Sequence, residues 1–206
     1  MLPVPLIFTS GWASGINSYA VVLLLGLYGR LGHVAGIPPL LEKPEVLAAA
    51  ALGFAGQFLA GKIPYLDSAW DLVHTFIRPV MAGAIAVLMA HHAHSSPVLT
   101  AAAALLGGGT ALTSHGVKTG LRMGINVSPE PVSTILASLG EDLGVAGIVS
   151  FAVFHPVPAA LIAAFLLAAG VAAVILLASR IRRARRRRRE RRLQGRAARV
   201  QTGQPS

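Results

Sequence analysis

A run of twenty uncharged residues, from Ala159 to Ala178, constrains the fold more than any other part of the chain. An α-helix of this length is ~30 Å long at ~1.5 Å per residue, which matches the hydrocarbon thickness of a bilayer. Arginines follow the run almost directly, and basic residues beside a span favour the cytoplasmic side of a membrane. The run therefore predicts a membrane-spanning helix that leads into a cytoplasmic C-terminus.

The composition extends this prediction to the rest of the chain. Of its 206 residues, 54% are hydrophobic and only 13% are charged, whereas a soluble domain carries about 25% charged residues. The chain contains no cysteine, which excludes disulfides and thiolate chemistry. We therefore expect an all-α integral membrane protein in a lipid bilayer, with five or six transmembrane helices.

The net charge of +10 belongs to the C-terminal tail. Six Lys and Arg stand against seven Asp and Glu up to Ala178, whereas twelve Arg stand against Glu190 alone after it. We expect a transmembrane domain over residues 1–178 and a cytoplasmic tail over 179–206, helical at first and then disordered. Because the arginines adjoin a span, the predicted partner is anionic lipid headgroups rather than nucleic acid, the alternative that charge alone allows.

The shorter apolar segments allow two topologies. Segment 132–154 is apolar but is divided by Gly140–Asp142. As one broken crossing it gives six crossings and a cytoplasmic N-terminus, and as a re-entrant hairpin it gives five crossings and an external N-terminus. Both alternatives predict a bundle with broken or re-entrant segments and place the C-terminus in the cytoplasm.

Asparagine occurs only at Asn17 and Asn126, each time at the end of the tripeptide Gly-Ile-Asn. Thr-Ser begins both segments, 9–17 and 113–126, so an internal two-fold repeat explains the pattern, although coincidence also does. Gly-interrupted apolar segments at matching places in two halves are typical of a transporter site. The two asparagines then either cap the helices that follow or contact a ligand.

A polar stripe is expected on one face of the helix that follows residue 65. Asp67, Asp71, His74 and Arg78 are separated by four, three and four residues, which places them on the same helical face. Charge inside a membrane is costly, so this face is expected to point into the bundle. Arg78 then either contacts an anionic ligand or pairs with a carboxylate of the chain. The carboxylates considered are those of Asp67, Asp71, Glu130 and Asp142.

A second basic stripe follows in the segment 114–131. His115, Lys118 and Arg122 are separated by three and four residues, so they also share one helical face. Ser-Pro-Glu-Pro, which contains Glu130, then begins another helix, and Asp142 lies in the next apolar segment. The pattern predicts either a network of paired charges or a path for ions or protons.

Several motifs together resemble a bacterial multi-pass membrane family known as domain of unknown function 4126. They lie in segments 14–19, 67–83, 113–122 and 126–142, and the resemblance covers about residues 8–150. It implies a protein of the bacterial plasma membrane. It implies no reaction, ligand, cofactor or catalytic residue.

These features favour a carrier or permease for a small anionic solute or a lipid headgroup. A non-transporting membrane scaffold is the alternative, and an intramembrane enzyme is a further one that no spacing demands. No cofactor is expected, and the histidine-rich stretch 91–94 is interpreted as a loop rather than a metal site. The expected ligand-binding residues are Asn17, Asp71, His74, Arg78, His115, Lys118, Arg122, Asn126, Glu130 and Asp142.

Overall fold

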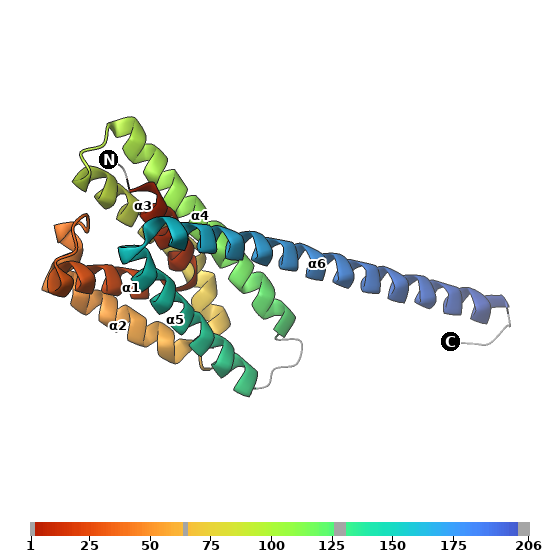
Figure 1. The fold of residues 1–206 in the computed structure, drawn as a ribbon. Helices are drawn as coiled ribbons and strands as arrows, with labels where there is room; N and C mark the ends of the chain where they lie inside the picture. The colour runs from red at the N-terminus through yellow and green to blue at the C-terminus, as the bar shows by residue number, and fades with distance from the viewer. Residues whose placement is uncertain (1–2, 64–65, 126–130, 202–206) are drawn as a thin grey trace.

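The computed structural model describes residues 3–63, 66–125 and 131–201, and the elements within them are all helical. Five of the described helices begin at a proline, a residue that fits the first turn because its missing N–H would have no partner there. The predicted all-α fold is confirmed. In chain order (Figure 1) the elements are α1 (Val4–Gly32), the 3-10 helix η1 (Pro39–Glu42), α2 (Pro44–Ala60), α3 (Leu66–His92), α4 (Pro97–Ile125), α5 (Pro131–Phe154) and α6 (Pro156–Gln201).

Among the described residues, five helices are long and apolar enough to cross a membrane. The sixth, α2, is apolar but has 17 residues, which gives ~25 Å of helix. The chain therefore has a multi-pass, membrane-type helical fold. The candidate spans are Val4–Gly32, Ala69–His92, Pro97–Arg122, Ile135–Phe154 and Pro156–Arg183.

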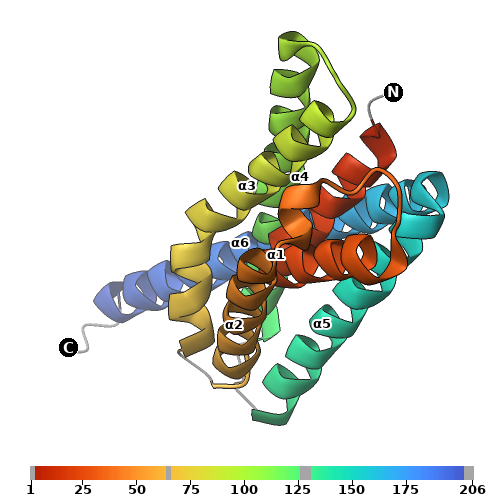
Figure 2. The ribbon, with the colours of Figure 1, turned by 90° about the vertical axis from the view of Figure 1, so that its left-hand side faces the viewer.

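Helix α1 occupies the centre of the bundle and contacts α2, α3, α4, α5 and α6. Both views place the turn between α3 and α4 at one end of the molecule and the ends of α2 and α4 at the other (Figures 1 and 2). Helix α6 packs against α1, α4 and α5 in its apolar part, where Gly170 and Val174 adjoin α4, and then projects far beyond the body (Figure 1). The central position of α1 makes its irregularity important for the whole bundle.

Helix α1 is broken at Asn17, whose backbone angles, φ −150° and ψ 91°, are not helical. The two halves of α1 run in different directions (Figure 2). The sequence before the break is rich in Gly and Ser, which are poorer helix formers than Ala. Non-helical backbone at membrane depth is tolerated only where protein or a cavity surrounds it, and Asn17 is fully buried. The predicted broken helix is thus confirmed in α1.

The break expected at Gly140–Asp142 is wrong, because α5 is one continuous helix across these residues. Neither the broken crossing nor the re-entrant hairpin expected for segment 132–154 is present, because the segment forms one uninterrupted helix. The physical reason lies in the side chains. Glu141 is paired with Arg122 of α4, and Asp142 accepts a hydrogen bond from Asn17. The acidic residues are accommodated by partners, so the backbone has no need to unwind.

Helices α1 and α4 approach so closely that two glycines of α1 have no room for a side chain. A Cβ on Gly11 would lie 2.7 Å from the carbonyl oxygen of Gly107, and a Cβ on Gly15 would collide with the carbonyl oxygen of Ala111. This close packing brings the break in α1 against the polar face of α4. Small residues at helix interfaces are the usual way to achieve such an approach in membranes.

Candidate functional site

The first half of α1 ends at the break with carbonyl groups that point at cations. Arg78 donates from Nη1 to the carbonyl oxygen of Gly15 at 3.2 Å, and Lys118 donates from Nζ to that of Ile16 at 3.4 Å. Cations suit this position because the C-terminal end of a helix carries partial negative charge. The break in α1 is therefore stabilised by basic residues of α3 and α4.

Two uncharged side chains complete the end of this half-helix. Ser114 donates to the carbonyl oxygen of Trp12 at 2.8 Å, and Gln57 of α2 donates to that of Ile16 at 3.1 Å. Side chains from three neighbouring helices thus serve the carbonyl groups of one half-helix. The sequence Thr113–Ile125, in which the second copy of the expected repeat lies, packs directly on the first copy here. The repeat itself stays a prediction.

The second half of α1 begins with a cap supplied by Asn17. Its side-chain oxygen accepts a hydrogen bond from the backbone N–H of Ala20 at 3.0 Å, and its Nδ2 donates to Asp142 Oδ1 at 3.0 Å. The capping interpretation is confirmed for Asn17. Asn126, its counterpart in the sequence, lies outside the described residues.

Five charged side chains form a continuous network beside the break, which we name the charge cluster. Arg78 Nη2 lies 2.9 Å from Asp71 Oδ1, and Lys118 Nζ lies 3.4 Å from the same oxygen. Lys118 Nζ also lies 3.2 Å from Glu141 Oε2. Arg122 binds Glu141 through two parallel contacts of 3.0 and 2.8 Å, a geometry that strengthens Arg–carboxylate pairs. Lys118 is therefore the residue that joins the two carboxylates.

His115 of α4 adds two further contacts to α3 beside the charge cluster. Its Nδ1 lies 2.6 Å from Arg78 Nη1 and its Nε2 lies 3.0 Å from the hydroxyl of Thr75. Arginine can only donate, so Nδ1 accepts from Arg78 and Nε2 carries the proton toward Thr75. Thr75 in turn donates to the backbone carbonyl of Asp71 at 3.0 Å. The neutral imidazole thereby holds Arg78 in place without adding charge.

His74 lies on the same face of α3 and contacts both Trp70 of its own helix and Tyr19 of α1. Its Nδ1 donates to the carbonyl oxygen of Trp70 at 2.8 Å, so its Nε2 accepts from the hydroxyl of Tyr19 at 3.0 Å. The Trp70 and His74 rings stack at 4.6 Å. The imidazole is thus fixed by three aromatic and polar contacts and links Tyr19 to the charged face of α3.

The structure brings most of the expected ligand-binding residues together around the break in α1. Glu130, like Asn126, lies outside the described residues. Glu141, Tyr19 and Gln57 also belong to this region but were not among the residues expected from the sequence. The signal for Glu141 was the presence of two basic residues on α4, Lys118 and Arg122, which need a carboxylate nearby when buried. The expected residues gathered here are Asn17, Asp71, His74, Arg78, His115, Lys118, Arg122 and Asp142.

Four of the five side chains of the charge cluster are almost completely withdrawn from the surface, whereas the Glu141 side chain is 23% exposed. Arg78 is 0% exposed, and Asp71, Lys118 and Arg122 are each below 9%. Among the carboxylates considered for Arg78, Asp71 makes the ion pair, while the side chains of Asp67 and Glu130 lie outside the described part of the structure. Removing one partner of a buried ion pair costs about 3–5 kcal/mol, because the other charge is left uncompensated. The cluster therefore holds α1, α3, α4 and α5 in one arrangement.

Several buried polar atoms in and around the charge cluster have no hydrogen-bond partner in the described part of the chain. They include Nε of Arg78, Oε1 of Gln57, Oγ of Ser14, Nε1 of Trp70 and Oδ2 of Asp142. Buried polar atoms are nearly always paired, so each exception calls for an explanation. The surroundings of the break thus contain both donors and acceptors that the described contacts leave unused. Within the described residues, no group of three or more His, Asp or Glu is placed to hold a metal ion.

The fold and the cluster define a class: a multi-pass, membrane-type helical protein with buried charges around a broken first helix. A family model described as a domain of unknown function (DUF4126) matches residues 4–176. The match covers most of the chain, so the chain belongs to this family, as its motifs indicated. Comparison with curated proteins and with solved structures finds no match.

Proposed function

We propose that the protein is a membrane carrier and that the charge cluster binds a small anionic solute. The observation that carries the proposal is the broken helix at the centre of the bundle, with two buried cations, Arg78 and Lys118, aimed at the break. Carriers commonly build their substrate sites near mid-membrane from such discontinuous helices. Ionisable residues inside a membrane also mark solute and ion paths more often than they serve packing alone.

Lys118 is the residue best suited to exchange partners with an anion. It contacts Asp71 and Glu141 at once, at 3.4 and 3.2 Å, so neither contact is as short as those of the arginines. An ammonium group is compact and has three rotatable donors. It can release one carboxylate, keep its bond to the carbonyl of Ile16 and bind an incoming anion. Arg78 adds an unused Nε donor to the same region.

Uptake into proteoliposomes tests the proposal. The probes are chloride, inorganic phosphate and acetate, with flipping of fluorescent phosphatidylglycerol as the arm for a lipid headgroup. We expect saturable uptake of at least one free anion, lowered at least tenfold by Lys118→Gln and partly kept by Lys118→Arg. Arg30→Gln is the matched control, since Arg30 is exposed in the last turn of α1. No uptake above that of protein-free liposomes, or equal uptake by Lys118→Gln, overturns the carrier.

A membrane scaffold is the second candidate, and the pairing inside the cluster favours it. Each of the five charged side chains already has an oppositely charged partner within 3.4 Å. A ligand that binds only the folded state raises its melting temperature, so the two functions differ in a simple measurement. Phosphate, chloride or acetate stabilises a carrier at millimolar concentration, whereas a scaffold unfolds at the same temperature with and without these anions.

The enzyme alternative receives less support from the described contacts. An acid–base pair would need a histidine and a carboxylate within hydrogen-bond reach. The hydrogen-bond partners that the described contacts give His74 and His115 are Tyr19, Trp70, Thr75 and Arg78.

We infer that the C-terminus lies in the cytoplasm beneath a plasma membrane, with its first arginines on anionic lipid headgroups. Helix α6 continues from its apolar part to Gln201, and Arg180, Arg182 and Arg183 are exposed just beyond the apolar run. Each such residue gains ~1 kcal/mol near an anionic surface. Because the chain has no cysteine, Ser206→Cys tests its side: an impermeant maleimide should label it only after the cells are opened. Labelling of intact cells contradicts the inference.

A further inference from the structure

A pocket of about 410 Å³ lies between α1, η1, α2 and α3, and it is separate from the charge cluster. Helices α2 and α3 contact each other far less than α3 and α4 do, so they leave a groove between them. Alanines on both helices keep the groove open. Its walls consist of Tyr19, Val22, Leu40, Leu41, Glu45, Val46, Ala49, Ala50, Met81, Ala84, Ile85 and Leu88.

The walls of this groove are aliphatic except at two places. Tyr19 contributes its ring, while its hydroxyl is engaged by His74. Glu45 is the single charged residue of the wall. A site of this kind, apolar with one or two fixed polar groups and a few hundred Å³ in volume, is typical of ligand pockets. The groove therefore suits a hydrocarbon chain that carries a polar group at one end.

The charges beside the groove indicate which polar group fits. Glu45 lies in the first turn of α2, where the positive end of the helix dipole favours a carboxylate. Lys43 occupies the N-cap position of the same helix, two residues before Glu45, and both residues are exposed. A carboxylate in the wall and an ammonium group two residues away in the chain complement a headgroup that itself carries an ammonium and a phosphate. The groove runs from this end along α3 from Leu88 to Met81, which is ~10 Å of helix.

We propose that the groove binds one acyl chain of a phosphatidylethanolamine-type lipid, with the primary ammonium on Glu45 and the phosphate near Lys43. The bilayer supplies this amphiphile directly to a groove between two helices of the bundle. A primary ammonium can donate hydrogen bonds to Glu45, which the quaternary ammonium of phosphatidylcholine cannot do. Phosphatidylglycerol offers no positive charge to Glu45 at all. The proposal is independent of the carrier function and of the charge cluster.

Lipid retention measured by native mass spectrometry tests this site on the full chain in detergent. Phosphatidylethanolamine, phosphatidylglycerol and phosphatidylcholine with identical acyl chains are added at equal concentration. The wild-type protein should retain phosphatidylethanolamine at least tenfold better than the other two lipids. Glu45→Gln should remove that preference while chain binding persists, because the walls of the groove are unchanged.

A second variant fills the groove itself. Ala84 lines the groove and is exposed, so Ala84→Phe should abolish the retained lipid without disturbing the core. Ala102→Phe, at an exposed position of α4, is the matched control and should retain lipid as the wild type does. Equal retention of the three lipids by the wild type, or unchanged phosphatidylethanolamine retention by Ala84→Phe, overturns the proposal. A melting temperature within a degree or two of wild type verifies that each variant is folded.

Discussion

Helices α1 and α6 differ in burial in a way opposite to that expected in a soluble protein, because the more polar helix, α1, is the buried one. In the most apolar stretch of α1, 72% of the residues are buried, although this helix carries Thr, Ser, Gly and Asn. In the corresponding stretch of α6, the most apolar of the candidate spans, 6% are buried. In water the more apolar helix would occupy the core. This contrast is the pattern expected of a helix bundle in which α6 faces the acyl chains of a bilayer and α1 is shielded from them.

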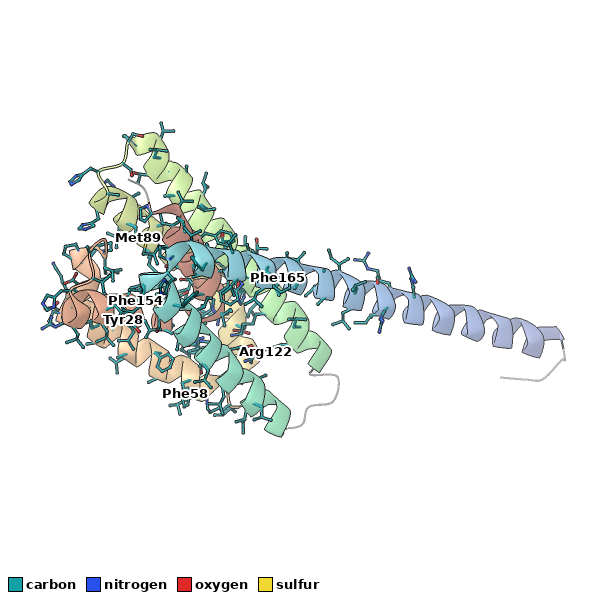
Figure 3. All side chains as sticks on the ribbon, viewed as in Figure 1. Tyr28, Phe58, Met89, Arg122, Phe154 and Phe165 are labelled. Carbon is teal, nitrogen blue, oxygen red and sulfur yellow. The ribbon has the colours of Figure 1, made fainter. Side chains whose placement is uncertain are left out.

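Side chains on α6 make the contrast concrete. Phe165 is 72% exposed and Leu161 is 69% exposed, and the Phe165 side chain lies on the outer side of α6 (Figure 3). On α1, by contrast, Thr9, Ser14 and Asn17 are completely buried. Polar groups need internal partners when no water surrounds the protein. Substitutions in the two helices and at their contacts test this inversion, and the largest effect is expected at the central cation.

Removing the central cation should damage the α1 region most. Arg78→Met leaves Asp71 and the carbonyl of Gly15 without their guanidinium partner, so we expect a loss of about 3–5 kcal/mol in unfolding free energy. Denaturation of the purified protein by SDS in mixed micelles measures it. Arg30→Met is the control, because Arg30 is exposed at the end of α1 and should cost less than about 1 kcal/mol. Equal losses of unfolding free energy in both variants would show that Arg78 is no more important for stability than an exposed arginine.

A charge on the outer helix should be nearly as harmful. Phe165→Asp places a carboxylate on the exposed side of α6, which costs about 2.5–3.5 kcal/mol in lipid but only ~0.5 kcal/mol at a surface in water. Phe165→Leu is the matched control and should be close to neutral. The fraction of protein that integrates into membranes, together with micellar unfolding, gives the comparison. Tolerance of the aspartate would mean that α6 does not face lipid.

Two glycines two residues apart on α4 test how closely the inner helices pack. A Cβ on Gly107 would lie 2.9 Å from the carbonyl oxygen of Ala82, whereas a Cβ on Gly109 meets nothing within 4 Å. Gly107→Ala should therefore cost about 1–3 kcal/mol. Gly109→Ala should be neutral or slightly stabilising, since alanine favours a helix. Melting temperatures of the two variants decide it, and the same shift in both would contradict the packing described.

Loss of the Asn17 cap at the break should lower the unfolding free energy least among these four sets of substitutions. Asn17→Ala removes the acceptor for the N–H of Ala20 and the donor to Asp142, so we expect a loss of about 1–2 kcal/mol. Asn17→Asp keeps the cap but places two carboxylates together, and should be the worse of the two variants. If Asn17→Ala melts with the wild type, the break does not depend on this side chain.

Much of this arrangement could be predicted from the sequence because helix periodicity aligns residues along a single element. The spacings within α3 and within α4 placed Asp71 with Arg78, and Lys118 with Arg122, on shared faces. Contacts between elements were harder, because spacing says nothing about which helices adjoin. Glu141, which joins α5 to Lys118 and Arg122, was missed for that reason.

The wrong break in α5 has a different cause. Glu141 and Asp142 seemed incompatible with a continuous membrane helix because the sequence does not show their partners, Arg122 on α4 and Asn17 on α1. At Asn17 the opposite occurs: the local sequence disfavours a helix and the neighbouring helices supply side chains for the released carbonyl groups. A helix break expected from local sequence is therefore observed only where neighbouring helices supply partners for the released backbone groups, as they do at Asn17.

Spin labels on single cysteines test the inversion between α1 and α6 most directly, and the natural chain has no cysteine to remove. Labels at Leu161, Phe165 and Ile175 of α6 in liposomes should collide freely with molecular oxygen and hardly with a water-soluble nickel chelate. A label at Ser18 of α1 should be shielded from both and immobilised. Ready access of the nickel chelate to the α6 labels, or of oxygen to the α1 label, would contradict the account.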